Sequence, residues 1–338
     1  MRYYVLEPQG EIENIKQREG PRPTIANPND VLVRVKATTL NYKDLALAWG
    51  WLPLNNAGAD YIPLSDGSGE VFEVGADVTE FAPGDRVVAA FFPEWQDGAP
   101  TGNELALGRE LPGMLSEFVC LPSHALVKIP PSLTFEQAAT FPCAGVTAWN
   151  ALCETAKLKA TDTVLTMGTG GVSVFAIQIA KAKGARVIAT TGSAEKESFL
   201  KKLGADHVVN YRKTGDWDKT VIDLTDGRGA DVIVEVGGAQ TFQKSLNAAA
   251  FGGRISCVGV LAGVEGHADP TSITFKSLSV RGVYVGSTTM LRQCFKFFHT
   301  HGIVPSLDSA QFSFDAPAEA YSHLARQAHT GKVVIRYL

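Results

Sequence analysis

The sequence lacks several features that would place it in specialised protein classes. No apolar run approaches the ~18–20 residues that a membrane span requires. The amino-terminal stretch reaches the charged Glu7 before the core of a signal peptide could form. Basic residues form no run, and 31 Lys and Arg stand against 35 Asp and Glu, which argues against a nucleic-acid-binding surface. We therefore expect a soluble, cytoplasmic protein with neither a nucleic acid nor a membrane as partner.

Cysteine is scarce and its spacing indicates no framework. The chain has five cysteines, an odd number, and no two of them form a CxxC pair. The pattern therefore favours neither a disulfide scaffold nor a clustered structural zinc site, and it suits a reducing compartment. The five are Cys120, Cys143, Cys153, Cys257 and Cys294.

Glycine is the residue in excess. The chain has 33 glycines in 338 residues, about 10% against the ~7% typical of proteins. The glycines cluster where expected strands meet expected helices, and they form neither a collagen-like nor a low-complexity tract. At ~150 residues per domain, the length of the chain suggests two domains.

The first 125 or so residues have the pattern of a β-rich domain. Residues 31–35 (VLVRV) alternate apolar and polar side chains, as a half-buried strand does. Residues 69–75 form a second such run, and residues 86–92 form a third after a Pro-Gly-Asp turn. The polar, glycine-rich residues 93–112 predict a long loop.

From about residue 133 the apolar period becomes helical, and strands then alternate with helices. This alternation predicts a parallel sheet with helices on both faces. The first helical stretch covers 134–152. The expected strands are 163–166, 186–191, 207–210, 232–236, 254–258 and 278–285. The expected helices between and after them are 172–183, 195–203, 240–250 and 290–301, and a last strand ends the chain.

A glycine-rich segment joins the first of these strands to its helix. It reads Gly168-Thr169-Gly170-Gly171-Val172-Ser173. In a dinucleotide-binding turn the first glycine permits a tight bend, the second lets the backbone approach a pyrophosphate, and a third small residue packs helix on strand. The helix N-terminus then offers N–H groups to the phosphates. The strand–turn–helix context predicts a dinucleotide site here rather than a purely structural turn.

The end of the second strand predicts which dinucleotide binds. An NAD site expects a carboxylate there, ~20 residues after the glycines, to accept from the ribose 2′-hydroxyl. The sequence has Thr191, Gly192 and Ser193 instead, with Lys196 following and Tyr211 closing the next strand. Hydroxyls and a cation suit a 2′-phosphate, so we expect NADPH, with NADH weaker. The alternative is that Lys196 is only a solvated helix lysine.

A series of motifs resembles the medium-chain dehydrogenase/reductase superfamily over nearly the whole chain. The matching segments are LNYKD (40–44), DGSGEVFEVG (66–75), PGDRV (83–87), FPCAGVTAW (141–149), GTGGVS (168–173), LGADHVVNY (203–211), GGRISCVG (252–259) and GKVV (331–334). The resemblance implies a GroES-like β-rich catalytic domain built from 1–127 and 288–338, with a Rossmann doubly wound parallel-sheet domain at 128–287. It also implies an active site at a cleft between them.

The resemblance places the chain in the zinc-free branch, which includes quinone oxidoreductases. Zinc-dependent members hold the catalytic metal with Cys, His and Cys, and the matching positions here are Asn41, Ser65 and Cys143. Asparagine and serine are poor zinc partners, and one thiolate cannot supply the three protein ligands of a catalytic site. The four-cysteine structural zinc loop of those enzymes is also missing. We therefore expect no metal, and Cys143 is expected to be a small buried residue beside the cofactor.

Without a metal, the oxygen that receives charge during hydride transfer needs hydrogen-bond donors. The resemblance points to LNYKD: Asn41 as a donor to a carbonyl, Lys43 as a proton donor, Asp44 as a residue that orients either, and Tyr42 near the cofactor. The alternative is that Lys43 and Asp44 form a helix-start charge pair at the surface. The resemblance also places cofactor contacts at Thr147, Val258, Gly259 and Val260.

Three functions follow from this pattern. The leading one is an NADPH-dependent, zinc-independent oxidoreductase acting on a small apolar quinone or α,β-unsaturated carbonyl. The alternatives are a zinc-free alcohol dehydrogenase and a protein that binds NADPH without turnover. The sequence leaves open whether five aromatic residues line the pocket: Trp49, Trp51, Phe91, Phe92 and Trp95. The apolar strand 278–285, expected at a sheet edge, predicts a homodimer formed by strand pairing.

Overall fold

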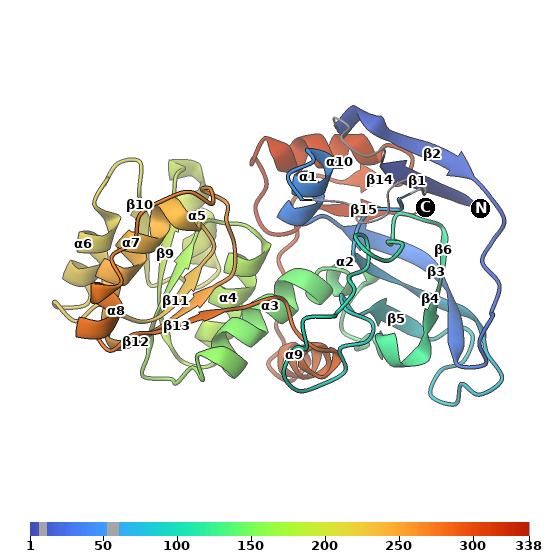
Figure 1. Ribbon diagram of the computed structural model, residues 1–338, viewed down its shortest axis with the longest axis horizontal. Coiled ribbons are helices and arrows are strands. Elements are labelled where there is room, and N and C mark those ends of the chain that lie inside the picture. Colours follow the sequence, from blue (N-terminus) through green and yellow to red (C-terminus); the bar gives the residue numbers. More distant parts are fainter. Residues whose placement is uncertain (7–11, 53–60, 338) are drawn as a thin grey trace. The chain divides into compact units, whose positions relative to one another are not determined.

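The computed structural model describes residues 1–6, 12–52 and 61–337, and the chain divides into two compact units (Figure 1). Unit 1 comprises Met1–Val146 and Gly286–Leu338, and unit 2 comprises Thr147–Val285. Residues 128–146 therefore belong with the β-rich unit, unlike the boundary expected at 128, because they bond to its sheet. The Thr39 hydroxyl donates to the Ala139 carbonyl at 2.9 Å, and the Ser68 hydroxyl donates to the Phe135 carbonyl at 2.7 Å.

Unit 1 is built on a sheet with the strand order β14-β15-β3-β4-β5-β7 in the described part of the chain, and β6 also pairs with β3. Its long strands alternate buried and accessible side chains only in part, over 33–37 in β3 and 69–72 in β4, because both faces of the sheet are covered near the ends of these strands. The strands of this unit are β1 (Arg2–Leu6), β2 (Ile15–Glu19), β3 (Asp30–Thr39), β4 (Asp66–Val74), β5 (Arg86–Ala89), β6 (Phe118–Pro122), β7 (Leu126–Lys128), β14 (Phe312–Ser313) and β15 (Val334–Arg336).

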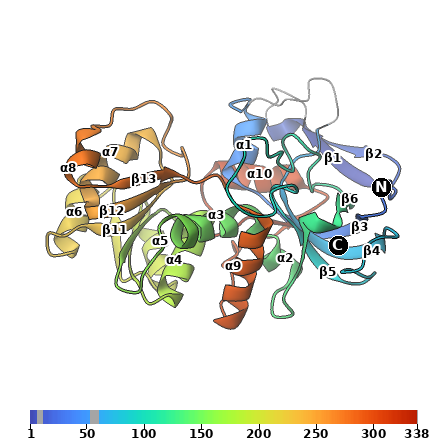
Figure 2. The same cartoon turned by 60° about the horizontal axis from the view of Figure 1, so that its bottom comes forward.

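The helices of unit 1 are short except near the carboxyl end. They are η1 (Ile12–Asn14), α1 (Tyr42–Ala48), η2 (Ser123–Ala125), α2 (Phe135–Ala138), η3 (Phe141–Gly145), α9 (Thr288–Thr300) and α10 (Pro317–Ala325). Helix α9, visible in Figure 2, brings the chain back to this unit. Its Phe295 and Phe298 rings lie 4.5 and 5.0 Å from the Phe141 ring, so aromatic packing fixes the returning segment.

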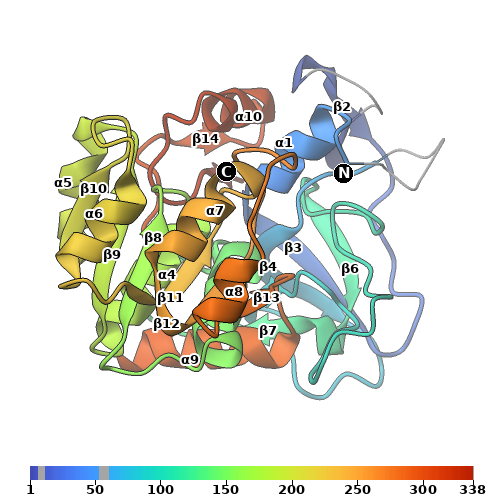
Figure 3. The same cartoon turned by 60° about the vertical axis from the view of Figure 1, so that its left-hand side comes forward.

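Unit 2, all of whose residues are described, has one parallel sheet with the strand order β10-β9-β8-β11-β12-β13. Figures 1 and 3 show its strands between α4 on one face and α7 on the other, which confirms the doubly wound architecture. The strands are β8 (Thr163–Met167), β9 (Arg186–Thr191), β10 (His207–Asn210), β11 (Ala230–Glu235), β12 (Ala249–Cys257) and β13 (Ser279–Gly282). The helical segments are η4 (Asn150–Thr155), α4 (Gly171–Ala182), α5 (Ala194–Lys202), α6 (Trp217–Leu224), α7 (Ala239–Ala248) and α8 (Thr271–Phe275).

Two expected elements differ from the structure. The helix expected at 134–152 is broken into α2, the π-helical turn η3, α3 (Val146–Trp149) and η4, because Pro142 has no N–H to continue an α-helix. The strand expected at 278–285 pairs only over Ser279–Gly282. The apolar side chains beyond it, Val283 and Val285, are buried within the chain.

Three neighbouring strands of unit 1 position the residues discussed below. Strand β3 pairs antiparallel with both β4 and β15, with Thr39 opposite Asp66 and also opposite Val334. The end of β3 and the starts of β4 and β15 therefore lie side by side at the same end of these strands. Residues just after β3 and just before β15 meet there, although almost the whole chain separates them in sequence.

Candidate functional site

A buried lysine lies where the end of β3 meets the starts of β4 and β15. Lys332 is 3% exposed, and the Leu40 N–H donates to the Val333 carbonyl at 3.1 Å, which sets the lysine against the end of β3. Gly331 precedes it with φ +76°, and a Cβ there would lie 2.4 Å from the Ser306 carbonyl oxygen. Glycine is therefore required at 331, and it delivers the Lys332 side chain to the interior.

The Lys332 ammonium makes three contacts, which we call the buried lysine cluster. Its Nζ donates to the Leu40 carbonyl at 2.7 Å, to Asn41 Oδ1 at 2.5 Å and to Asp66 Oδ2 at 3.4 Å. Asp66 is fully buried, and its carboxylate also accepts from the Ser65 hydroxyl at 2.8 Å. The Thr39 hydroxyl, which shares its one proton with the Ala139 carbonyl, lies 3.3 Å from Asp66 Oδ2. Each buried charge thus has an opposite charge and further polar partners, as burial requires.

Asn41 is held on three sides. It is the N-cap residue of α1, its backbone N–H donates to Asp44 Oδ2 at 2.7 Å, and its Oδ1 accepts from Lys332. Its amide nitrogen Nδ2 is buried and has no hydrogen-bond partner among the described residues. A buried donor without an acceptor is unfavourable unless a ligand supplies one. Asn41 therefore offers one free, oriented donor.

Lys43 and Asp44 form a pair at the start of α1, but it is not the surface pair that the sequence left open. Asp44 is 1% exposed, and the Lys43 ammonium lies 3.0 Å from its Oδ1. Burial raises the pKa of the Asp44 carboxyl, and the Lys43 charge and the Asn41 N–H oppose that rise. Lys43 Nζ also donates to the Gly108 carbonyl at 3.4 Å and lies 5.3 Å from the centre of the Phe91 ring. Asp44 thus connects the Lys43 side chain to the Asn41 backbone.

The five aromatic residues that the sequence analysis singled out form two groups. Phe91, Phe92 and Trp95 are buried and pack ring against ring, with centres 4.6 and 5.9 Å apart. The Trp49 ring packs at a tilt of 48° against Trp51, with centres 4.8 Å apart, and Trp51 is 66% exposed. The half-buried Tyr42 ring lies edge-on to Trp49 at 6.5 Å, and burial raises the pKa of its hydroxyl.

The positions that match metal ligands do not fit zinc. Asn41 Oδ1 is occupied by an ammonium, and the Ser65 hydroxyl donates to Asp66. Burial raises the pKa of the Cys143 thiol to about 12, and one thiolate cannot supply the three protein ligands of a catalytic zinc site. Within residues 1–6, 12–52 and 61–337, no group of three or more His, Cys, Asp or Glu side chains is placed to hold a metal ion.

The glycine-rich segment of unit 2 has the backbone that the sequence predicts. Gly168 follows β8 with φ +76°, which favours glycine, and its N–H donates to the Thr190 carbonyl at 2.8 Å. Gly170 is the N-cap residue of α4, and a Cβ there would meet nothing within 4 Å. The buried Ser173 hydroxyl donates to the Met167 carbonyl at 2.5 Å, so a serine replaces the third glycine and ties α4 to β8. The intervening positions are Thr169, which is buried, Gly171 and Val172.

At the end of β9, the structure brings the predicted residues together. The Thr191 hydroxyl accepts from the Ser193 N–H at 3.2 Å, and the Tyr211 N–H donates to the Thr191 carbonyl at 3.0 Å. The Tyr211 ring, 43% exposed, covers Gly192, where a Cβ would lie 2.5 Å from the tyrosine hydroxyl. Lys196 lies in the first turns of α5, and Ser193 is the N-cap of this helix.

Two carboxylates lie in the first turns of α5, and one of them, Glu197, is engaged elsewhere. Glu197 accepts from Asn210 Nδ2 at 3.0 Å and lies 3.5 Å from Lys213 Nζ. These contacts lower the pKa of its carboxyl, with the Asn210 hydrogen bond as the main cause. Glu195, the other acidic residue of this first turn, is exposed.

A buried glutamate, which the sequence analysis did not single out, shapes the ends of β11 and β12. Glu235 is 1% exposed. Its Oε1 accepts from the N–H groups of Gly237 and Gly238 at 2.7 and 3.1 Å and from the Thr241 hydroxyl at 2.7 Å, and its Oε2 accepts from the Ser245 hydroxyl. The Glu235 backbone carbonyl accepts from the N–H groups of Val258 and Gly259 at 2.8 and 3.3 Å. The predicted contact residues Val258, Gly259 and the exposed Val260 thus stand on a rigid base, and Thr147 is buried at the start of unit 2.

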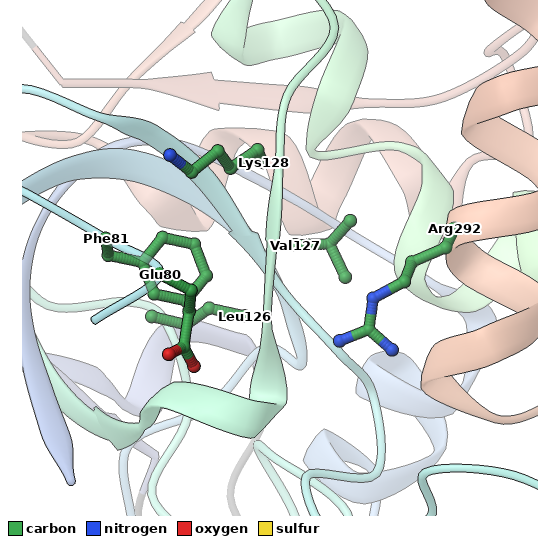
Figure 4. Close-up of a pocket in the computed structure, with 6 residues that line it drawn as sticks. All are labelled: Glu80, Phe81, Leu126, Val127, Lys128 and Arg292. Atoms are coloured by element: carbon green, nitrogen blue, oxygen red, sulfur yellow. The ribbon is translucent and has the colours of Figure 1, made fainter. Parts of the chain in front are cut away.

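A separate surface pocket of about 450 Å³ lies in unit 1 (Figure 4). Its lining residues are Glu80, Phe81, Leu126, Val127, Lys128 and Arg292. None of the predicted site residues belongs to it, so it is not the candidate site. Over the described residues, no helix has the length and apolar character needed to cross a membrane.

Sequence reasoning missed Lys332 and the contact role of Asp66. Both residues lie in motifs that carried the family resemblance, GKVV and DGSGEVFEVG. A lysine placed between a glycine and an apolar strand was the available signal, because a charged residue at a strand start that becomes buried needs a counter-charge. Asp66, at the start of a strand of mostly small and apolar residues, is that counter-charge.

Two family models match the chain. Residues 27–131 match the alcohol dehydrogenase GroES-like domain, and residues 171–300 match the zinc-binding dehydrogenase domain. The chain is 41% identical to a zinc-type alcohol dehydrogenase-like protein of Schizosaccharomyces pombe, over 99% of both chains. It is 32% identical to a quinone oxidoreductase-like protein 2 homolog of Nematostella vectensis, over 91% of this chain and 81% of the relative.

A solved structure agrees with these matches. The crystal structure of a putative alcohol dehydrogenase from Sinorhizobium meliloti superimposes with a TM-score of 0.91 at 42% identity, covering 99% of this chain and 98% of that chain. Together with the two units and the glycine-rich turn, these similarities establish the family, including its dependence on a nicotinamide dinucleotide. The chain belongs to the medium-chain dehydrogenase/reductase superfamily, as an NAD(P)-dependent oxidoreductase with a GroES-like and a Rossmann-type domain.

Proposed function

We propose that this protein is an NADPH-dependent, zinc-independent reductase of quinones or α,β-unsaturated carbonyls. The observation that carries the proposal is Asn41 Nδ2, a buried donor with no partner among the described residues. A carbonyl or quinone oxygen is an acceptor that fits such a donor. The similarity to a quinone oxidoreductase-like protein supports the same class of substrate.

The residues of unit 2 suit NADPH. In the proposal, the N–H groups at the start of α4 bind the pyrophosphate, because Gly170 leaves open space there. Thr191, Ser193 and Lys196 bind the 2′-phosphate, and Tyr211 lies beside them over Gly192. The backbone at Val258–Val260 and the Thr147 side chain hold the nicotinamide. The bound cofactor supplies the hydride.

Three residues of unit 1 stabilise and then neutralise the charge that hydride addition creates. When a hydride adds to a conjugated carbon, negative charge develops on the carbonyl oxygen, and Asn41 stabilises it through Nδ2. We assign the proton that then neutralises the enolate to Lys43. Two of its three ammonium protons are directed at Asp44 and Gly108, which leaves one for transfer. The Asp44 carboxylate holds the Lys43 ammonium and the Asn41 backbone N–H in place by hydrogen bonds.

A zinc-free alcohol dehydrogenase is the second candidate, and the similarity to alcohol dehydrogenase-like proteins favours it. A saturated aldehyde concentrates charge on a single oxygen, which calls for a stronger electrophile than an amide. A steady-state panel of NADPH oxidation tests the two. We expect kcat/KM for 1,4-quinones or conjugated ketones to exceed that for saturated aldehydes of equal size by more than about tenfold, or ~1.4 kcal/mol. Faster turnover of saturated aldehydes would replace this proposal with the dehydrogenase.

We also propose that the protein assembles as a homodimer through β13, the edge strand of the unit 2 sheet. Its exposed backbone can pair with a second copy. The side chains Phe275 and Tyr284 near this edge are 79% and 54% exposed, which supports the proposal. Light scattering at micromolar concentration should give twice the 36.1 kDa mass of the chain, and a value equal to one chain would contradict it.

A further inference from the structure

Each of the three protons of the Lys332 ammonium is donated to an acceptor within the protein. The acceptors are the Leu40 carbonyl, Asn41 Oδ1 and Asp66 Oδ2. An ammonium group has three donors and no acceptor, so none remains for a substrate. Lys332 is also 3% exposed. Its position therefore suits a residue that acts through its neighbours.

The neighbour with chemical consequences is Asn41. An asparagine amide can be turned by half a rotation, which exchanges its acceptor oxygen with its donor nitrogen. A lysine ammonium can only donate, so the amide must present Oδ1 to Lys332. The same constraint leaves Nδ2 as the group without a partner. The Lys332 ammonium thus fixes the orientation of the amide together with the Asp44 backbone N–H, which the Asn41 side chain also faces in the capping box of α1.

We propose that Lys332 is a positioning residue that fixes the Asn41 amide as a donor and so makes the site select ligands with an acceptor oxygen. This inference rests on the proposed function, in which Asn41 contacts the substrate oxygen. Asp66 completes the arrangement, because its carboxylate lies 3.4 Å from the buried ammonium and holds it in place.

Removal of the ammonium should reverse the amide. In Lys332→Met, the groups that remain around the vacated position are the Leu40 carbonyl and the Asp66 carboxylate, and both only accept. They attract Nδ2, which turns Oδ1 outward. A ketone then faces an acceptor and loses its hydrogen bond, whereas an alcohol donates to Oδ1 and keeps one. A general loss of structure would weaken both ligands alike.

The test compares two ligands of one shape, cyclohexanone and cyclohexanol, by equilibrium titration of tryptophan fluorescence in the presence of NADPH, so that no turnover is required. In Lys332→Met, we expect the preference for cyclohexanone over cyclohexanol to fall at least about tenfold from the unmutated value. Lys332→Arg, which also only donates, should retain the preference. In the Asn41→Ala background, Lys332→Met should have no further effect on it.

Lys276→Met is the matched control. The Lys276 ammonium also donates to three carbonyl oxygens, those of Leu246, Asn247 and Ala249, at 3.0, 2.6 and 3.0 Å. This lysine lies in unit 2, so its loss should lower stability and leave the ligand preference unchanged.

The outcomes separate the two proposals. If Asn41→Ala alters the ligand preference and Lys332→Met does not, the positioning role is wrong and the proposed function stands. If Asn41→Ala alters neither ligand, the contact between Asn41 and the substrate is wrong. If Lys332→Met does not fold, Lys332→Gln replaces it. The glutamine amide can donate and accept, so the Asn41 amide is no longer fixed, and a preference equal to that of Lys332→Arg would overturn the inference.

Discussion

The substitution Gly170→Ala should separate cofactor binding from folding. Gly170 has φ −75° and ψ 173°, a conformation that alanine adopts freely. A Cβ there would meet nothing within 4 Å of the protein. A weaker N-cap destabilises by up to ~1 kcal/mol, and the reduced entropy of the unfolded chain offsets ~0.4–1 kcal/mol of that. The free energy of unfolding should therefore change little.

Binding should change far more. If the open space beside Gly170 receives the pyrophosphate, a methyl group there displaces it from the N–H groups of α4. Loss of one charge-assisted hydrogen bond corresponds to ~1.5–3 kcal/mol, so the Kd for NADPH should rise by roughly 10- to 100-fold. Isothermal titration calorimetry gives the Kd, and urea unfolding without cofactor gives the stability.

Gly215→Ala is the control for this substitution. A Cβ at Gly215 also meets nothing within 4 Å, in the loop between β10 and α6. It should change neither the Kd nor the unfolding free energy by more than ~0.5 kcal/mol. An unchanged Kd for NADPH in Gly170→Ala would refute the placement of the pyrophosphate at this turn.

Four further predictions follow. Asn41→Ala should lower kcat by ~10²–10³ and change KM less, because the contact strengthens as charge develops; steady-state kinetics check this, and an unchanged kcat would contradict it. Elemental analysis should find substoichiometric zinc, and activity should survive prolonged chelation; one tightly bound zinc per chain would show the reverse. NADPH should bind at least ~10-fold tighter than NADH, and Lys196→Ala should remove most of that difference; equal Kd values in the unmutated protein would exclude the 2′-phosphate site. Burial raises the pKa of the Asp44 carboxyl, so at pH values just above the ordinary pKa of ~4 the folded state holds a proton that the unfolded state has lost. The stability contributed by Asp44 is therefore present below this pH range and falls as pH rises through it. Urea midpoints measured across the range should fall less in Asp44→Asn than in the unmutated protein, and identical slopes would be inconsistent with this prediction.

Much of unit 2 could be predicted because local patterns determine its elements. Residues 186–191 and 207–210 form strands with the bounds that the alternation indicates. Gly168 adopts the positive φ for which the motif uses glycine. Ser173 shows how the motif tolerates its departure, since the serine hydroxyl bonds the Met167 carbonyl. These features depend on residues a few positions apart, so one stretch of sequence contains the information.

The site of unit 1 could be predicted only in part. The LNYKD segment drew attention to Asn41, Lys43 and Asp44, and the structure joins all three by hydrogen bonds. The partner of Asn41 remained hidden, because the contact with Lys332 spans 291 positions. Whether Lys43 and Asp44 form a surface pair was also undecidable from composition, since burial depends on the elements packed around α1.

The buried lysine cluster is the reason that we propose a conjugated substrate for this site. A catalytic metal polarises an oxygen directly, through an open coordination position. The Lys332 ammonium has no open position, because the protein accepts all three of its protons, and Asp66 neutralises its charge. In the proposed function, the group that contacts the substrate oxygen during hydride transfer is the Asn41 amide, and Lys43 supplies a proton only afterwards. One neutral donor stabilises a developing oxyanion less than a cation does. Such a site favours acceptors that disperse the charge over a conjugated system, and this is the physical reason that the proposal names quinones and enones ahead of saturated aldehydes.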